Sequence, residues 1–371
     1  MRRLVWIVDQ LGPGGAEQLA LRFAAEPSPF RIELVSLHAA PESLQALWGN
    51  SWEAVRGRVH VLGMRGLDDA GSWGRLLRLL RAWEPALLHL HLRYAIVWGG
   101  WAAHLLRLPY VVTVHQGPHA DRTRCQRFIA TCERWSRRHA ARVVYVSGAQ
   151  RKAWGRIAGR ERTVVIGNGV ALADPASAGE RAALRRALGL PPHAPVYVTV
   201  AVVRAAKGWR TWLEAAERIV AAHPEACLVW VGGGPEWEQF RQAAAHSHAC
   251  GHLVLAGQRS DVTNWLRASD VFLFPSQEEA QPTAVMEAMA AALPIIASRL
   301  PAIAEVLDGS GWLVPAQNPA ALAEAALAWS DADHPARRAS AAAARQRAEA
   351  TLSESRWHRR MLELYADVLA P

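Results

Sequence analysis

The stretch VFLFPSQEEAQPTAVMEAMAAALPIIAS, from Val271 to Ser298, decides the fold. It contains an apolar run, a polar loop, a segment rich in helix-forming residues and a second apolar run, which predicts strand, loop, helix and strand. A unit of this kind is typical of a parallel sheet covered by helices. Ligands bind such sheets beyond the carboxyl ends of the strands, so the loop that starts at Pro275 is a candidate site.

Two carboxylates accompany this loop: Glu279 lies in it, and Glu287 comes eight positions later on the helix. Each carboxylate accepts hydrogen bonds from two hydroxyl groups, which suits the vicinal diols of a sugar or a ribose. The main-chain N–H groups around Gln281 and Thr283, at the start of the helix, suit a phosphate. Sugar and phosphate at one site predict an enzyme that uses a nucleotide sugar.

Short apolar runs alternate with helical patterns along the rest of the chain, which predicts an α/β fold with two doubly wound parallel sheets. The first series of predicted strands is Leu4–Val8, Ile32–Leu37, Val59–Leu62, Leu87–Leu90, Tyr110–Val114, Val143–Ser147 and Val164–Ile166. The second series is Val196–Val202, Leu228–Val231, Leu253–Ala256, Val271–Pro275 and Ile295–Ala297. Residues 171–195, with their prolines and small side chains, are the predicted connection between domains 1–170 and 196–353, and residues 354–371 are a predicted final helix.

Composition argues against several protein classes. The chain has 371 residues, of which 51% are apolar, enough for two cores. No uncharged apolar run reaches the ~18 residues of a membrane-spanning helix. The first apolar run ends at Asp9, which is too short for a signal peptide. Four scattered cysteines without a CxxC pair favour the reduced thiols of a cytoplasmic protein over a disulfide framework or a zinc site.

Charge is unevenly distributed along the chain. Residues 1–162 contain 24 Lys and Arg and 12 Asp and Glu, a net charge of +12, whereas residues 163–371 have a net charge of −3. The richest basic stretch contains Arg122, Arg124, Arg127, Arg134, Arg137, Arg138 and Arg142. A basic helical patch is typical of a surface that binds anionic lipid headgroups or an anionic acceptor, and an ordinary solvated face is the alternative. No aromatic platform or zinc-finger spacing accompanies these arginines, which argues against nucleic acid.

Lysine is nearly absent from the chain. There are 40 arginines but only two lysines, Lys152 and Lys207. Lys207 follows the first strand of the second domain and precedes Gly208, a position from which a compact ammonium group can neutralise a diphosphate leaving group. Arg204, three residues earlier, is a candidate second cation.

Further candidates follow strands of both domains. His115 comes directly after an apolar strand, where its side chain can donate to a sugar hydroxyl. Gly14 and Gly15 follow the first strand and let the backbone approach a ligand, although they lack the GxGxxG spacing of dinucleotide-binding proteins. Gln258 and Val262 follow the third strand of the second domain, where main chain can contact a nucleobase.

A metal site is not expected. The letters of a DxD motif occur at Asp331 and Asp333, but they lie in a predicted loop between late helices and precede His334-Pro335. No HExxH, P-loop or GxSxG motif occurs either. We therefore expect no cofactor, with the nucleotide sugar as substrate.

Together these residues resemble the retaining glycosyltransferases of the GT-B fold, specifically the family-four class of "group 1" transferases. The features that carry the resemblance span nearly the whole chain. They are Gly14–Glu17, His115, Ile166–Val170, Lys207-Gly208, Gly232–Pro235, Ser269–Val271 and the PSxxE(x7)E block that includes Glu279 and Glu287. The resemblance implies two Rossmann-like domains that face a central cleft, with the helix from Glu354 returning to the first domain.

The resemblance also implies roles for individual residues. Glu279 corresponds to the glutamate that holds the donor-sugar hydroxyls, and Glu287 to the one that holds the ribose hydroxyls. Lys207 corresponds to the lysine that binds the diphosphate. His115 corresponds to the histidine beside the reacting sugar, and Gly15 to the glycine under the diphosphate.

The sequence departs from the family pattern at four positions. These are Val202, where the family has arginine, Ala280 and Ala292, where it has glycine, and Ala171, where it has aspartate. Arg204 and Arg210 are candidates to replace the missing arginine. The changes either narrow the donor site or reduce activity, so a catalytically inactive homologue that binds nucleotide sugars is one alternative.

We expect a cytoplasmic, metal-independent transferase that moves a hexosyl or related group to a hydroxyl acceptor with retention of anomeric configuration. The second domain is expected to bind the donor and the basic first domain the acceptor, a lipid-linked saccharide or a polysaccharide or lipopolysaccharide precursor of the cell envelope. A peripheral position on the inner face of the cytoplasmic membrane follows from the basic patch. A nucleotide-sugar epimerase of the same fold, which needs no acceptor, is the second alternative.

Overall fold

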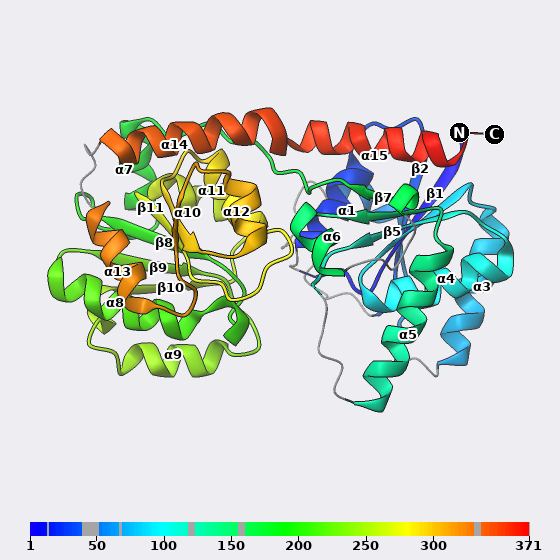
Figure 1. The fold of residues 1–371 in the computed structure, drawn as a ribbon, viewed down its shortest axis with the longest axis horizontal. Coiled ribbons are helices and arrows are strands. Elements are labelled where there is room, and N and C mark those ends of the chain that lie inside the picture. Colours follow the sequence, from blue (N-terminus) through cyan, green and yellow to red (C-terminus); the bar gives the residue numbers. More distant parts are fainter. Residues whose placement is uncertain are drawn as a thin grey trace. The chain divides into compact units, whose positions relative to one another are not determined.

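The computed structural model describes residues 1–12, 15–38, 52–66, 69–117, 123–154, 160–329 and 335–370. Two compact units make up the chain: Met1–Asn168 with Ser355–Pro371, and Gly169–Glu354. Each unit contains a parallel β-sheet with helices on its faces (Figure 1), which confirms the predicted fold class. All of the predicted connection, residues 171–195, lies within the second unit.

The first unit has a seven-stranded sheet in the order β3-β2-β1-β4-β5-β6-β7. Its strands are β1 (Arg3–Val8), β2 (Arg31–Ser36), β3 (Val59–Val61), β4 (Leu87–His91), β5 (Tyr110–Val114), β6 (Arg142–Tyr145) and β7 (Thr163–Val165). Its helices are α1 (Gly15–Ala25), α3 (Ala70–Trp83), α4 (Arg93–Leu106), α5 (Arg124–His139), α6 (Gly148–Trp154) and α15 (Glu354–Val368). All seven predicted strands of this domain are present, whereas α4 is a helix that the sequence analysis did not assign.

Alternation along the strands divides the core of the first unit into two layers. Leu4, Trp6 and Val8 of β1 belong to one apolar cluster, and Val5 and Ile7 belong to the other. Successive strand residues point to opposite faces, so a strand buried on both sides needs an unbroken apolar run. Helix α15 covers the first of these faces with Trp357, Met361, Leu364 and Tyr365.

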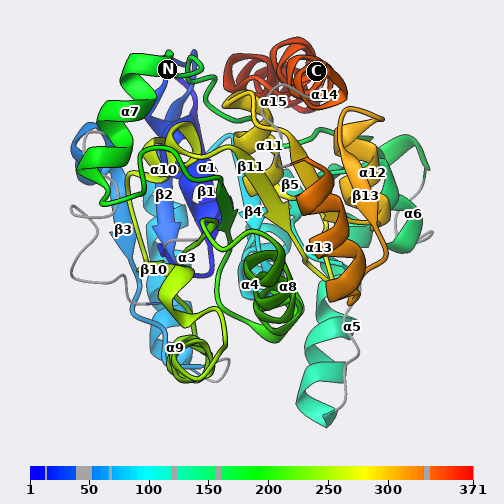
Figure 2. The ribbon, with the colours of Figure 1, turned by 90° about the vertical axis from the view of Figure 1, so that its left-hand side faces the viewer.

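The second unit has a six-stranded sheet in the order β10-β9-β8-β11-β12-β13. Its strands are β8 (Val196–Val200), β9 (Cys227–Val231), β10 (Leu253–Gly257), β11 (Val271–Phe274), β12 (Ile295–Ser298) and β13 (Trp312–Val314). Its helices are α7 (Ala178–Ala187), α8 (Trp209–Ala222), α9 (Trp237–Ala245), α10 (Val262–Ala268), α11 (Thr283–Ala290), α12 (Pro301–Leu307), α13 (Pro319–Ala328) and α14 (Pro335–Arg347). Helices α8 and α13 lie side by side against the sheet (Figure 2). The edge strand β13 and helix α12 are additions to the predicted elements.

Asp270 explains why the predicted connection belongs to the second unit. Its carboxylate accepts hydrogen bonds from Arg185 Nη2 at 2.5 Å, Arg181 Nη1 at 3.0 Å and the backbone N–H of Val196 at 2.8 Å. Arg181 and Arg185 lie on α7, so one carboxylate ties this helix to the starts of β8 and β11. The Ser269–Val271 motif is therefore part of the framework of the second unit.

Both sheets have the same doubly wound strand order, in which the first strand lies between the second and the fourth. The connections therefore leave in opposite directions after β1 and β4 in the first unit, and after β8 and β11 in the second. A gap between loops opens at such a switch point, beyond the carboxyl ends of the two central strands. The loops after β8 and β11 carry the predicted residues Lys207 and Glu279.

Gly208 lets the loops after β8 and β11 pack against each other. Its φ is +71°, and a Cβ atom added there would lie 2.0 Å from the carbonyl oxygen of Pro275. The backbone N–H of Gln277 donates to the carbonyl oxygen of Ala206 at 2.8 Å, which fixes the same two loops. Glycine is required at position 208 both by the left-handed backbone and by the missing space.

We predict that Gly208→Ala lowers the free energy of unfolding much more than Gly189→Ala. Gly189 has a similar φ of +68° but open space around its Cα, so both substitutions carry the left-handed cost of about 1 kcal/mol. Only Gly208→Ala adds overpacking against Pro275, worth about 1–3 kcal/mol more. Urea denaturation followed by circular dichroism measures both values. Equal destabilisation by the two variants would contradict the close packing of these loops.

Candidate functional site

Lys207 and Glu279 form an ion pair at the switch point of the second sheet. Lys207 Nζ donates to Glu279 Oε1 at 2.6 Å, and Ser276 Oγ donates to the same oxygen at 2.8 Å. The Glu279 side chain is 7% exposed and that of Lys207 is 24% exposed. Two of the residues selected from the sequence, 72 positions apart, are thus in direct contact.

Glu236 anchors the loop that carries Lys207. Its carboxylate accepts from the backbone N–H of Ala205 at 2.8 Å and from Trp209 Nε1 at 2.9 Å. These two hydrogen bonds, the one from Trp209 first, hold the pKa of Glu236 below its usual range. The sequence analysis missed this residue, although it directly follows the Gly232–Pro235 turn.

The loops after β8, β9 and β10 form a continuous backbone rim. The backbone N–H of Gly232 donates to the carbonyl oxygen of Gly257 at 2.8 Å, and the backbone N–H of Val203 donates to the carbonyl oxygen of Gly233 at 2.9 Å. Gly232 has a φ of +142°, and a Cβ there would lie 2.0 Å from a backbone oxygen of the loop after β8. Predicted donor-binding residue Gln258 follows Gly257 on this rim and is exposed.

Helix α11 carries Glu287. Thr283 begins the helix and Glu287 lies four residues later, so the two share a face. Both are half-buried, whereas most of the intervening and following residues of α11 are buried. No side chain caps the N-terminus at Pro282. Gln281 precedes this end of the helix and is half-buried.

The remaining donor-binding candidates occupy different positions. Arg204 is exposed and precedes the short 3-10 turn Ala205–Lys207, and Val262 begins α10. Arg210 stacks over the Trp209 ring at 4.0 Å and approaches Glu236 at 3.5 Å, so it supports the loop. In the first unit Gly15 is the first residue of α1, and Gly14 lies outside the described residues.

The departures from the family pattern have distinct local settings. Ala292 has a φ of +56°, the left-handed conformation that glycine adopts most easily, just after the C-cap of α11. Ala280 is not among the residues with positive φ, so the loop does not require glycine there. Val202 is 36% exposed in the loop after β8.

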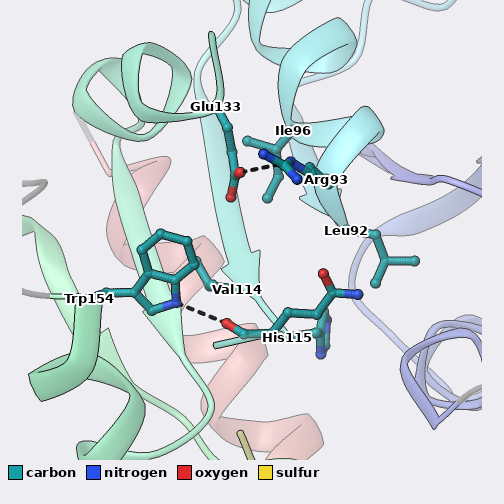
Figure 3. Close-up of a pocket in the computed structure, with 8 residues that line it drawn as sticks. Leu92, Arg93, Ile96, Val114, His115, Glu133 and Trp154 are labelled. Atoms are coloured by element: carbon teal, nitrogen blue, oxygen red, sulfur yellow. Dashed lines mark hydrogen bonds and ion pairs between the residues drawn. The ribbon is translucent and has the colours of Figure 1, made fainter. Parts of the chain in front are cut away.

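His115 lies in a pocket of the first unit, at the carboxyl end of β5 (Figure 3). Arg93, Glu133 and Trp154 also line this pocket, and the Arg93 Nε to Glu133 Oε2 distance is 3.5 Å. Trp154 Nε1 donates to the carbonyl oxygen of Gln116 at 2.8 Å, which fixes its ring at the pocket wall. Burial lowers the pKa of His115 to about 4, so the imidazole is neutral at pH 7.

The basic stretch proves to be smaller than predicted. Arg124, Arg127, Arg134 and Arg138 of α5 are exposed, and Phe128 beside them is 59% exposed. Arg137 does not belong to this surface, because its side chain is 1% exposed.

Arg137 instead faces the interior of the first unit. Its Nη2 atom lies 3.7 Å from Glu133 Oε1, and its guanidinium group stacks 3.9 Å from the centroid of the Trp154 ring. Arg142 forms an ion pair with Asp367 at 2.6 Å, and Arg122 lies outside the described residues. Helix α5 packs against α4 through Ile129 and Cys132, and Arg137 lies on the inner side of α5, where it stacks on Trp154.

The sequence analysis expected neither a metal site nor a membrane-spanning helix, and the structure bears on both only within the described residues. Within the described ranges, no cluster of three or more His, Cys, Asp or Glu side chains is arranged to hold a metal ion. Asp331 and Asp333 lie outside those ranges. Among the described helices, none has the length and apolar character needed to cross a membrane.

Comparisons with known families match both units. A model described as "Glycosyltransferase Family 4" matches residues 13–174, and one described as "Glycosyl transferases group 1" matches residues 194–331. The 2-deoxystreptamine N-acetyl-D-glucosaminyltransferase of Streptomyces fradiae is 28% identical over 72% of this chain and 69% of its own length. The phosphatidyl-myo-inositol mannosyltransferase of Mycobacterium leprae is 32% identical over 68% of this chain and 66% of its own length.

Solved structures match the fold over nearly the whole chain. HepE of Anabaena, solved in complex with UDP-glucose, has a TM-score of 0.85 at 18% identity and covers 99% of this chain and 100% of its own. At this identity the likeness concerns the fold alone. Taken with the two family models and the relatives, it places the chain in the group 1 family of glycosyltransferases with the GT-B fold.

Proposed function

We propose that this glycosyltransferase moves a sugar from a nucleotide diphosphate sugar to a hydroxyl group of a saccharide or lipid-linked acceptor, with retention of anomeric configuration. The observation that carries the proposal is the Lys207–Glu279 ion pair at the switch point of the second sheet. A glycosyl diphosphate carries sugar hydroxyls, which a buried carboxylate can bind, and a negatively charged diphosphate, which a partly exposed ammonium group can bind. The UDP-glucose complex of the HepE structure is consistent with such a donor.

Lys207 is proposed to bind the diphosphate. Without a ligand its ammonium group is held by Glu279 at 2.6 Å. A donor diphosphate brings a second anion to this ammonium group, which stabilises the negative charge that develops as the glycosidic bond breaks. Arg204, exposed three residues earlier, is in position to add a second cation.

Glu279 and Glu287 are proposed to bind hydroxyl groups of the donor. Glu279 Oε1 already accepts two hydrogen bonds, from Lys207 and Ser276, so its orientation is fixed before the donor arrives. Its second oxygen is then the acceptor for hydroxyls of the sugar. Glu287, on the half-buried face of α11, is assigned to the ribose, and the N–H groups near Thr283 to phosphate.

The remaining donor contacts are proposed on the same basis. Gln258 and Val262, on the rim beyond β10, are assigned to the nucleobase through their main chain. Gly14 and Gly15 of the first unit are assigned to the diphosphate, and His115 to the reacting sugar. These residue assignments are the basis on which we propose that the whole chain belongs to family four and that it retains the anomeric configuration of the sugar.

A retaining reaction on these residues needs no side chain as nucleophile. The acceptor oxygen attacks the anomeric carbon on the face from which the diphosphate leaves, and the acceptor proton passes to the leaving phosphate oxygen. The new glycosidic bond replaces the old one, so the atoms balance without a further reactant. Because Lys207 supplies positive charge at the leaving group, we propose that no metal ion or other cofactor takes part.

The acceptor is assigned to the first unit and its basic helix α5. Relatives act on very different acceptors by name, from 2-deoxystreptamine to phosphatidyl-myo-inositol. The exposed arginines and Phe128 of α5 suit the anionic surface of a membrane, so we propose a peripheral position on the inner face of the cytoplasmic membrane. A role in building cell-envelope saccharides follows from that position.

Two alternatives remain distinct from transfer to an acceptor. An epimerase of the same fold converts its nucleotide sugar without any acceptor. An inactive homologue binds the nucleotide sugar without consuming it, as the departures at Val202, Ala280 and Ala292 would favour. Incubating purified protein with UDP-, GDP- and ADP-sugars, with and without acceptor, distinguishes transfer, epimerisation and binding without reaction. A thermal-shift panel of the same nucleotides identifies the base, because a ligand that binds the folded state raises the melting temperature.

We predict that Lys207→Ala and Glu279→Ala each slow glycosyl transfer by about one to two orders of magnitude. Each removes a charge-assisted hydrogen bond, worth roughly 1.5–3 kcal/mol. Lys207→Ala is also expected to reduce the thermal shift produced by UDP, because the diphosphate loses its cation. Initial transfer rates and melting temperatures measure the two effects.

Lys152→Ala is the matched control for these variants. It removes the only other lysine of the chain, which is exposed on α6. Circular dichroism establishes that each variant remains folded. Transfer rates of Lys207→Ala and Glu279→Ala equal to that of Lys152→Ala would reject the proposed roles.

We predict that the protein sediments with phosphatidylglycerol vesicles and not with phosphatidylcholine vesicles. Each arginine near an anionic surface contributes about 1 kcal/mol, so Arg127→Ala/Arg134→Ala should weaken binding by about tenfold or more. Salt should weaken binding as well, because it screens exposed charges. The double variant Arg78→Ala/Arg81→Ala, which removes two exposed arginines of α3, is the control and should bind like the wild type. Binding that is equal for both double variants would refute a role for α5.

A further inference from the structure

A pair of histidines underlies the pocket of the first unit. His91 ends β4, and His115 follows the neighbouring strand β5 by one residue. Their rings are nearly parallel, with His91 Nδ1 at 2.9 Å from His115 Nε2. One of these two nitrogens must donate a proton to the other, so the tautomers of the two rings are linked.

His91 is enclosed by other rings. Its side chain is 3% exposed, and it lies against Trp6 at 4.4 Å and against His89 at 3.9 Å between ring centroids. Its second nitrogen, Nε2, is buried and has no hydrogen-bond partner among the described residues. Burial lowers the pKa of His91 well below its usual value, so this ring is neutral at pH 7, as is His115.

The unpartnered nitrogen decides which tautomer His91 adopts. A buried N–H without an acceptor is rarer and more costly in proteins than a buried lone pair without a donor. The proton of His91 therefore resides on Nδ1, and Nδ1–H donates to Nε2 of His115. Since Nε2 of His115 is then the acceptor, the single proton of the neutral His115 ring resides on Nδ1.

His89 does not compete for this hydrogen bond. Its Nδ1 lies 2.6 Å from the hydroxyl of Tyr365, and its Nε2 lies 2.7 Å from Oγ1 of Thr113. Both nitrogens of His89 are thus engaged with hydroxyl groups. His91 is the ring that contacts His115 through a hydrogen bond, and Trp6 on its other side offers only an aromatic face.

We infer that His91 is a positioning residue that fixes His115 in the Nδ1–H tautomer and so makes it a neutral hydrogen-bond donor to an oxygen of the substrate. Nδ1 of His115 has no hydrogen-bond partner among the described residues and is not among the fully buried polar atoms, so it is open to a ligand. His115 lines the pocket in Figure 3. The catalytic consequence rests on the proposed function, whereas the tautomer itself does not.

The tautomer can be read directly by ¹⁵N NMR. Protein labelled with ¹⁵N-histidine gives ring-nitrogen shifts that distinguish N–H from unprotonated nitrogen, and His115→Phe assigns the His115 signals by their loss. We expect His115 to be protonated at Nδ1 in the wild type at pH 7, although free neutral histidine favours Nε2–H in water. In His91→Phe, which keeps the ring against Trp6 and loses the donor, the Nε2–H form of His115 should appear. A wild-type His115 protonated at Nε2, or spectra of His115 unchanged by His91→Phe, would overturn the inference.

We predict that His91→Phe lowers kcat for transfer by about tenfold, the effect of one lost hydrogen bond of about the usual strength. His91→Asn is expected to recover most of the rate, because the side-chain amide places an N–H donor where Nδ1 lies. His104→Phe, which replaces an exposed histidine of α4 outside the pocket, is the control and should not change kcat.

The kinetic and spectroscopic results separate two kinds of failure. Wild-type protein that transfers no sugar, with His115 in the Nδ1–H form, would refute the proposed function and leave the tautomer inference intact. Equal rates for His91→Phe and His91→Asn would show that the hydrogen bond to His115 does not matter for transfer and would overturn the positioning role.

Discussion

The buried carboxylate of Glu279 is the constraint on which the site of the second unit depends. A carboxylate 7% exposed is costly unless it is paired and hydrogen-bonded, and here it has both Lys207 and Ser276. The pairing requires the loops after β8 and β11 to approach each other, and glycine at position 208 allows that approach. Strand order, loop packing and charge are thus parts of one arrangement.

The two units use one strand order for two kinds of chemistry. In the second unit the switch point retains opposite charges, because the carboxylate and the ammonium group compensate each other. In the first unit the last residue of β4 and the first residue after β5 are histidines, which burial keeps neutral. The pocket of the first unit thus combines neutral imidazoles with the Arg93–Glu133 ion pair, whereas the switch point of the second unit has the Lys207–Glu279 pair.

The sequence was sufficient to predict every strand except β13, because apolar runs follow burial. It also selected Lys207 and Glu279 for one site, because lysine is so scarce that its one example after a strand stands out. Features that depend on tertiary packing were not predictable. Arg137 belongs to a run of arginines by sequence, yet it is buried and stacks on the Trp154 ring of α6. Glu236 has no special spacing, and its role appears only when the loops after β8 and β9 are in contact.

The departures from the family pattern separate into backbone and ligand effects once the structure is known. Ala292 follows the C-cap of α11 with a φ of +56°, so replacing glycine there carries a backbone cost of about 1 kcal/mol that does not involve the donor. Ala280 has no such requirement, and its methyl group adds bulk directly after Glu279. Val202 is an apolar residue where the family has arginine, in the loop that also carries Arg204. Of the three changes, Val202 is therefore the one that removes a positive charge relative to the family pattern, and Arg204 lies two residues further along the same loop.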